Sequence, residues 1–233
     1  MSGQLDVVVC NEHDAVRAEQ GGADSVELVG SFDDDWYSPD VDLVERTCNR
    51  VDIPVRPLAR LRPGFRTDGG EVTRLRGLIS AYFSAGARGV VLGFLDGYSG
   101  IDVEVTHALV DDIGFPWTLD RAFDHTLDPQ REWHKLDEFP TLDRVLTAGS
   151  AIDVGHGLDL LIQAARNNRQ VASLAVAAGH IVPENVPWLV RAGITKFQIR
   201  THARPQGDMR AGVDADLVGS WRDLIDDEIA RVR

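Results

Sequence analysis

The sequence is poor in cysteine, in lysine and in long hydrophobic runs, and each shortage excludes a class of protein. Its two cysteines, Cys10 and Cys48, are too few for a disulfide framework, and their spacing matches no zinc motif. No hydrophobic run approaches the roughly 20 residues of a membrane-spanning helix, and no amino-terminal targeting signal is recognisable. Lysine occurs only at Lys135 and Lys196, so arginine carries nearly all the positive charge. We therefore expect a cytoplasmic protein with no membrane partner.

The charge balance is strongly acidic. The 233 residues include 37 acidic side chains against 24 lysines and arginines, which gives a formal net charge of −13. Nucleic acids and anionic membranes bind basic surfaces, so neither is an expected partner. The hydrophobic fraction of 43% is sufficient for a large core.

Short β-branched runs alternate with helical stretches along the whole chain. This alternation predicts parallel strands joined by crossover helices, and eight such units predict a single (β/α)8 TIM barrel over residues 1–233. A doubly wound open sheet is the alternative, but no Gly-x-Gly-x-x-Gly motif follows the first strand. The expected strands are 5–9, 25–29, 54–59, 89–93, a run from 117, 144–147, 171–177 and 196–199. The expected helices are 11–19, 38–49, 70–85, 102–112, 128–136, 158–165, 183–191 and the stretch from 214 to the end.

Polar side chains follow the strands, where TIM barrels build their sites. The central example is the stretch from Trp117 to Asp124, in which an apolar run turns into Asp120, Arg121 and Asp124. Such residues are too polar to be buried alone, so they pair with each other or face a ligand. The candidates at the strand ends are Glu27, Arg60, Arg62, Asp96, Asp120, Arg121, Asp124, Thr147, Ser150, His180, Arg200, His202 and Arg204.

The candidate acids and arginines each allow two interpretations. Arg60 and Arg62 either clamp an anion or form an ionic network with Asp96 and Glu27 that ties the barrel mouth together. Glu27 lies in mid-strand, where it is either salt-bridged or a general acid/base whose pKa is raised by burial. The other candidates for acid/base or catalytic work are Asp96, Asp124 and Arg121.

Ligand contacts are also expected from the later strands. Thr147 is the last residue of the sixth expected strand, Gly149 follows that strand, and Gly179 follows the seventh. Phosphate sites in these barrels often use the loops after strands seven and eight, here Gly179 and residues 201–204. The alternative is ordinary loop chemistry.

Three histidines raise the question of a metal site. His125, His180 and His202 would supply nitrogen ligands beside Asp120 or Asp124. None of them has the i, i+4 spacing of helical ligands, and none lies inside an expected strand. We therefore predict no metal ligand from the residues themselves.

Seven collinear stretches carry a family resemblance. They are 22–28, Ser38-Pro39, 53–55 with Arg60 and Arg62, 89–96, 120–124, 144–149 and 183–186. Together they resemble the CutC family, called the copper homeostasis proteins, from about Leu5 to Ala203. The resemblance implies a (β/α)8 barrel, a cytoplasmic homodimer and a copper-binding or copper-handling role, without an assigned reaction.

The sequence departs from the family pattern at several polar positions. Val29 stands where the family has a cysteine, and Asp120 and Gln198 stand where it has histidines; Asp6 replaces a glutamate. The cysteines proposed to bind Cu(I) are therefore not retained, although soft thiolates are what select that ion. The matching positions are Glu27, Arg60, Arg62, Asp96, Arg121, Asp124, Thr147 and Gly149.

Three functions stay open at this point. The first is a CutC-family copper homeostasis protein whose acid and guanidinium groups bind a small anionic molecule, with copper as the ligand implied by the family. The second is a TIM-barrel enzyme with acid–base chemistry of the lyase, isomerase or hydrolase type and no copper role. The third is a divergent member without activity.

Overall fold

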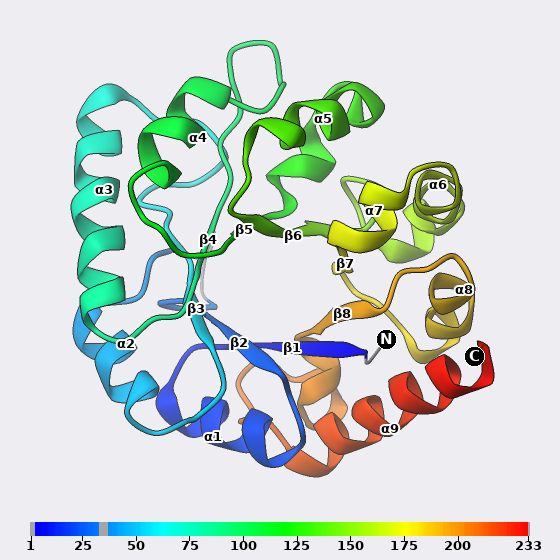
Figure 1. Cartoon of the computed structure of the whole chain (residues 1–233). Coiled ribbons are helices and arrows are strands. Elements are labelled where there is room, and N and C mark those ends of the chain that lie inside the picture. Colours follow the sequence, from blue (N-terminus) through cyan, green and yellow to red (C-terminus); the bar gives the residue numbers. More distant parts are fainter. Residues whose placement is uncertain (1–2, 33–36, 233) are drawn as a thin grey trace.

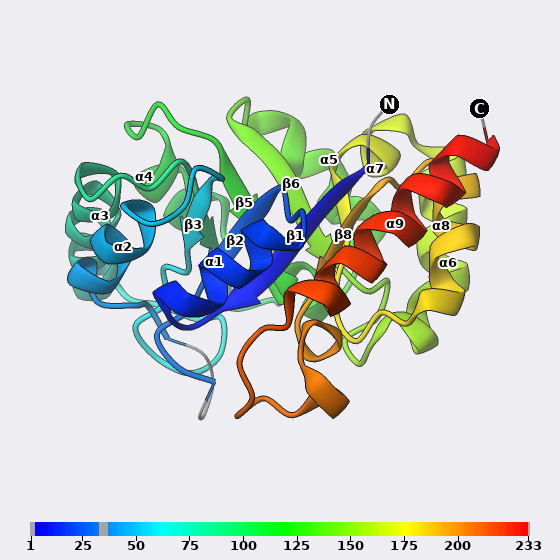
Figure 2. The same cartoon turned by 90° about the horizontal axis from the view of Figure 1, so that it is seen from below.

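Eight parallel strands form the centre of the molecule. The computed structural model describes residues 3–32 and 37–232 of the chain, so most of the loop expected at 33–37 lies outside the described residues. Figure 1 looks down the ring of strands, and Figure 2 shows it from the side. The strands are β1 (Gln4–Val9), β2 (Ser25–Leu28), β3 (Val55–Pro57), β4 (Val90–Leu92), β5 (Trp117–Leu119), β6 (Leu142–Thr147), β7 (Ala175–Ala177) and β8 (Lys196–Ile199).

The helices lie around the outside of the strands (Figure 1). Side chains cap many of them: Asn11 accepts a hydrogen bond from the Asp14 N–H, and Asp102 accepts one from the Val105 N–H. The helices are α1 (Glu12–Gln20), α2 (Val41–Cys48), α3 (Gly69–Ser84), α4 (Val103–Val110), α5 (Pro129–Lys135), α6 (Val154–Asn167), α7 (Arg169–Leu174), α8 (Val186–Arg191) and α9 (Ala215–Val232). Within the described ranges, no helix is both long and apolar enough to cross a membrane.

The strands close into a barrel. Their order is β3-β2-β1-β8-β7-β6-β5-β4, with every pair parallel. The two ends of this order meet through a single bridge between Leu58 and Val91, beside which the Ala59 N–H donates to the Val91 carbonyl at 2.8 Å. The predicted (β/α)8 TIM barrel is therefore confirmed, and the open sheet is excluded.

The seventh unit differs from the prediction. The stretch expected as a strand from Val171 begins instead as helix α7, and β7 covers only Ala175–Ala177. A short apolar run does not by itself distinguish a strand from a buried helix. The Asn168 side chain favours the helix, because it caps the first turn by accepting a hydrogen bond from the Gln170 N–H at 2.9 Å.

The barrel interior changes from polar to apolar and back to polar along its axis, as the inward positions of β3 and of the residues that follow it illustrate. Arg56 bonds Thr118 and Asp143 across the amino-terminal end. Leu58 belongs to an apolar layer in the middle, and Arg60 lies at the carboxyl end. The apolar layer consists of Val8, Val29, Leu58, Val91, Leu146, Val176 and Ala178. Val8, Leu58 and Leu146 of this layer line a cavity at the carboxyl end of the barrel.

Candidate functional site

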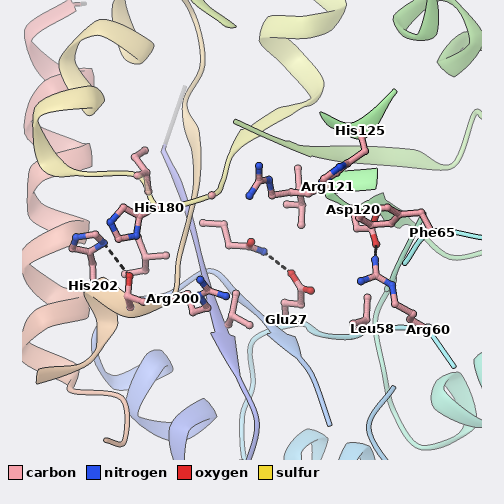
Figure 3. Close-up of a pocket in the computed structure, with 17 residues that line it drawn as sticks. Glu27, Leu58, Arg60, Phe65, Asp120, Arg121, His125, His180, Arg200 and His202 are labelled. Atoms are coloured by element: carbon pink, nitrogen blue, oxygen red, sulfur yellow. Dashed lines mark hydrogen bonds and ion pairs between the residues drawn. The ribbon is translucent and has the colours of Figure 1, made fainter. Parts of the chain in front are cut away.

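A cavity of about 310 Å³ opens at the carboxyl ends of the strands (Figure 3). Val8, Leu58 and Leu146 of the apolar layer contribute to its lining. The polar lining comes from the ends of β2, β3, β5, β7 and β8 and from the loops that follow them. This is the position at which TIM barrels build their sites.

Glu27 lies in this cavity as a buried carboxyl group that has no ion-pair partner in the part of the chain that the structure describes. Its Oε2 accepts a hydrogen bond from the Gln198 Nε2 at 2.6 Å, and it forms no ion pair with the described residues. Burial raises the pKa of Glu27 to about 7, while the hydrogen bond from Gln198 and the charge of Arg60 act in the opposite direction. Of the two interpretations from the sequence, this geometry favours the raised pKa over the salt bridge.

Arg60 pairs with Asp120 rather than with Asp96 or Glu27. Its Nη2 donates to Asp120 Oδ2, and its guanidinium also lies 4.7 Å from the centre of the Phe65 ring. The other Asp120 oxygen accepts from the Ala122 N–H at 2.7 Å. Both oxygens of Asp120 are therefore occupied, and the pair is nearly neutral in charge.

The end of β4 is shaped to admit Asp120. A Cβ added at Gly93 would overlap the Oδ1 atom of Asp120 and lie 2.9 Å from the Ala122 Cβ. Glycine at this position thus allows the carboxylate of the neighbouring strand end to turn toward Arg60.

Arg121 is held on one side and faces the cavity on the other. Its Nε donates to Asp124 at 2.7 Å, and its Nη2 donates to the Ser150 and Ile152 carbonyls at 3.0 and 3.3 Å. Its Nη1 has no hydrogen-bond partner among the described residues, and Figure 3 shows the guanidinium pointing into the cavity. A guanidinium fixed in this way is preorganised to bind an anion.

Asp124 supports Arg121 from behind. Besides the arginine, it accepts hydrogen bonds from the Thr147 hydroxyl at 2.6 Å and from the Ala148 N–H at 2.9 Å. Burial raises the pKa of Asp124, and these donors together with Arg121 lower it. Asp124 and Thr147 do not line the mouth cavity; they line a separate groove between α5 and α6.

The remaining wall carries further basic groups. Arg200 follows β8, and burial together with the charge of Arg121 lowers its pKa. His180 and His202 follow β7 and β8, with their ring centres 5.4 Å apart. Burial and the neighbouring His180 lower the pKa of His202.

Not every residue predicted from the sequence lies at the cavity. Glu27, Arg60, Arg121 and Gly179 line it, whereas Arg62, Asp96, Thr147 and Gly149 do not. Arg62 turns outward to Asp68 and Glu71, each at 2.5 Å. Asp96 accepts the N–H groups of Tyr98 and Gly100 within its own turn.

Gly149 serves close packing. A Cβ added there would overlap the Gly157 carbonyl oxygen and lie 2.9 Å from the Leu161 Cβ, so glycine lets the end of β6 approach α6. Its φ of +73° lies in the left-handed region that favours glycine.

Gln198, noted in the sequence as the replacement of a family histidine, and Phe65 are cavity residues that were not among the predicted site residues. The signal for Gln198 was available in the alternation of β8, because a period of two directs Lys196, Gln198 and Arg200 to the same face. No comparable pattern marks Phe65, which lies in a loop and reaches the cavity through the path of that loop alone.

The donor atoms needed for copper are poorly represented. No group of three or more His, Cys, Asp or Glu side chains in residues 3–32 and 37–232 is placed to hold a metal ion. Burial raises the pKa of the Cys48 thiol to about 11, so this thiol is protonated at neutral pH. The side chains present therefore do not fit a thiolate site for Cu(I).

Comparison with known proteins identifies the relatives of this chain. A family model described as the CutC family matches residues 4–202. A CutC family protein of Xanthomonas campestris pv. campestris (strain 8004) is 32% identical over 239 residues, which cover 98% of this chain and 95% of the relative. A CutC family protein of Enterobacter sp. (strain 638) is 27% identical over 95% of this chain and 97% of its own length.

A solved structure shares the fold. It is a CutC protein of Streptococcus agalactiae that is named for copper homeostasis. It matches with a TM-score of 0.74 and 20% identity, over 84% of this chain and 97% of that chain.

Proposed function

The chain belongs to the CutC family, and from that premise we propose that it binds a small anionic molecule at the barrel mouth and exchanges a proton with it through Glu27. The observation that carries this proposal is a carboxyl group with a pKa of about 7 in a cavity lined by guanidinium groups. A general acid or base works best when its pKa lies near the operating pH. An enzyme with acid–base chemistry is the function that this arrangement supports best.

We assign anion binding to Arg121. Its Nε and Nη2 are fixed by Asp124 and two carbonyl oxygens, and its Nη1 has no hydrogen-bond partner among the described residues. Little side-chain entropy remains to be lost when an anion binds. Arg60, whose charge is balanced by Asp120, contributes a polar but nearly neutral group to the opposite wall of the cavity.

A role in copper homeostasis comes to this chain from the name of its Streptococcus agalactiae relative. Family membership supports a role in copper homeostasis. Among the described residues, however, no three His, Cys, Asp or Glu side chains are placed to bind a copper ion. We therefore derive no chemical step through copper. The homodimer and the cytoplasmic location that the resemblance implies stay predictions.

Calorimetry on matched arginine variants tests the anion site. The wild-type protein is titrated with a panel of small carboxylates and phosphates, and the titrations are repeated with Arg121→Met and Arg74→Met. We expect Arg121→Met to weaken binding about tenfold or more, because one charge-assisted hydrogen bond contributes about 1.5 to 3 kcal/mol. Arg74 is exposed on α3 away from the cavity, so its variant should bind like the wild type.

Folding and copper binding are controlled in the same series. Asp124 keeps two hydrogen bonds in Arg121→Met, from Thr147 and Ala148, so the variant should fold. Anion binding that is equal in all three proteins would rule out the assignment to Arg121. Tight Cu(I) binding lost in Cys10→Ser, without any anion binding, would favour a copper carrier over an enzyme.

A further inference from the structure

A hydrogen bond joins Glu27 to Gln198 across the strand that lies between them. Glu27 belongs to β2 and Gln198 to β8, and β1 runs between these two strands. The β1 residue in register with Glu27 is Val8, an apolar part of the cavity lining. Neighbouring strands lie about 4.8 Å apart, so two long side chains are needed to meet over a third strand. The Gln198 Nε2 reaches the Glu27 Oε2 at 2.6 Å (Figure 3).

This hydrogen bond makes the two oxygens of the Glu27 carboxyl group unequal. Oε2 is held by the amide, whereas Oε1 accepts no hydrogen bond and forms no ion pair with residues 3–32 and 37–232. Oε1 is also absent from the fully buried polar atoms of these residues that lack a partner. Because Glu27 lines the cavity, an oxygen that is neither bonded nor sealed off is open to that cavity.

Resting on the acid–base role proposed above, we propose that Gln198 is a positioning residue, which holds Oε2 of Glu27 and reserves Oε1 as the oxygen that exchanges the proton. When Oε1 takes a proton from the ligand, the electron pair of the broken bond stays on the ligand and the carboxylate becomes neutral. Oε2 is then the carbonyl oxygen of the acid and goes on accepting from the same N–H. Gln198 therefore keeps Glu27 in one orientation throughout the transfer.

An amide suits this position because it donates a hydrogen bond and carries no charge. A cationic donor would form an ion pair with Glu27 and strongly lower its pKa. The hydrogen bond from Gln198 opposes the effect of burial only in part, so the pKa of Glu27 is still raised to about 7. The carboxyl group can therefore both take up and release a proton near neutral pH.

The alternative is an amide that reverses when Glu27 is protonated. Its carbonyl oxygen would then accept from the O–H of the acid, and the proton would lie on Oε2. A fixed N–H donor bonds the ionised form more strongly than the neutral form, so it lowers the pKa of Glu27. A reversing amide would bond both forms and change that pKa little. Removal of the amide therefore distinguishes the two arrangements.

Charged groups from other strands and strand ends also face Glu27, namely Asp6, Arg60, Asp120 and Arg200. The two aspartates raise the pKa of Glu27 and Arg60 lowers it, while the charge of Glu27 raises the pKa of Arg200. Arg56, the β3 residue in register with Glu27, is bonded to Asp143. All of these groups are kept in a variant of Gln198, so their effect is common to the variant and the wild type.

An NMR titration of Gln198→Met in the full chain tests the role of the amide. Methionine is about as long as glutamine but has no donor, and carboxyl-labelled glutamate reports the titration midpoint of Glu27, assigned with Glu27→Gln. We expect the midpoint in Gln198→Met to lie about 1 to 2 pH units above that of the wild type, the size expected for one hydrogen bond to a charged group. Gln130→Met, at an exposed position on α5, is the control and should leave the midpoint unchanged.

The Gln198 side-chain amide gives a second measurement. Its resonances are those that disappear in Gln198→Met. We expect one of its two N–H protons to stay hydrogen-bonded, at a downfield chemical shift, both below and above the Glu27 midpoint. Gln198→Asn keeps the amide but is one methylene shorter, so it should not reach across β1 and should titrate like Gln198→Met.

The outcomes distinguish the role of Gln198 from the function on which it rests. A wild-type midpoint near the ordinary value of 4.5 would remove the acid–base role of Glu27, and the role of Gln198 with it. A midpoint near 7 that neither Gln198→Met nor Gln198→Asn changes would overturn the role of Gln198 alone. A Gln198 N–H that loses its hydrogen bond when Glu27 is protonated would also overturn it and place the proton on Oε2.

Discussion

Glu27 and Asp120 are buried carboxyl groups in the same cavity, and their partners make them chemically different. Asp120 has an arginine on one oxygen and a backbone N–H on the other. Among the described residues, Glu27 accepts a hydrogen bond from the Gln198 amide alone, which compensates little of the cost of burying a charge. Burial raises the pKa of both carboxyl groups, but Arg60 and the Ala122 N–H oppose this rise at Asp120, whereas the pKa of Glu27 reaches about 7.

The raised pKa of Glu27 predicts a specific pH dependence of stability. The unfolded chain releases this proton near the ordinary value of 4.5 and the folded chain near 7, so between them the folded state holds more protons. Folded stability from this group is therefore full below about pH 4.5 and is lost as the pH rises through 7. Glu27→Gln removes the effect, and its stability relative to the wild type should rise by about 3 kcal/mol between pH 4 and pH 8.

Urea unfolding at the two pH values measures this difference. Other titrating groups cancel in the comparison of variant and wild type. Glu45→Gln, an exposed position on α2, is the control and should show no such change. A constant difference between Glu27→Gln and the wild type would mean that Glu27 has the same pKa in the folded and the unfolded chain.

At the scale of elements, the contact between neighbouring strand ends orients the site. β4 and β5 pair in parallel, so Gly93 and Asp120 leave the sheet side by side. Because Gly93 has no side chain, Asp120 can turn toward Arg60 on the far side of β4. A small residue on one strand thus determines the partner of a charged residue on the next.

Gly93→Ala should destabilise the barrel mouth. The added Cβ overlaps the Asp120 carboxylate, so either the strand end or the Arg60–Asp120 pair must move, at a cost of about 1 to 3 kcal/mol. Gly77→Ala is the matched control, because nothing lies within 4 Å of its added Cβ in the interior of α3. The control should gain about 0.5 to 1 kcal/mol from helix propensity. Equal unfolding midpoints for the two variants would contradict this account of Gly93.

At the scale of the whole molecule, Arg204 joins the first unit of the barrel to the last. Its fully buried side chain donates to Asp14 on α1 at 2.9 Å, to the Val8 carbonyl of β1 at 3.2 Å and to the Arg200 carbonyl at 2.8 Å. Asp14 also accepts the Val213 N–H just before α9. Figure 2 shows α1 and α9 side by side, so this network lies where the chain closes on itself.

Arg204→Met is expected to cost about 3 to 5 kcal/mol of stability, because it leaves the buried Asp14 charge without its partner. Arg76→Met breaks the ion pair with Asp112, which is exposed to solvent, and should cost about 0 to 1 kcal/mol. Urea unfolding of both variants tests the contrast. Similar losses in the two would show that burial does not set the value of these pairs.

Much of the fold was predictable from the sequence because its signals are local. Helix caps such as Asn11 and Asp102 and the alternation of strands and helices depend on neighbours a few residues away. The exception, the stretch from Val171, shows where a local signal is ambiguous: apolar character is the same in a buried strand and a buried helix.

The candidate site was predictable only as a set of residues at strand ends. Glu27, Arg60 and Arg121 do meet in one cavity, as barrel geometry requires of inward positions. Arg62 and Asp96 are also charged residues that follow strands in the sequence. Arg62 nevertheless pairs with Glu71 of α3, and Asp96 accepts a hydrogen bond within its own turn. Side-chain direction at the end of a strand depends on the loop that follows, which has no periodic pattern.

The sequence by itself determined the barrel, the acidic surface and the family, because periodicity, composition and motif order are properties of the chain. Only the tertiary structure decided that Glu27 is hydrogen-bonded to the Gln198 amide and that Asp120 forms the ion pair with Arg60. Those choices leave Glu27 with a pKa of about 7 and balance the charge of Arg60. The physical reason is that burial and pairing depend on atoms brought together from strands more than a hundred residues apart, as Glu27 and Gln198 are.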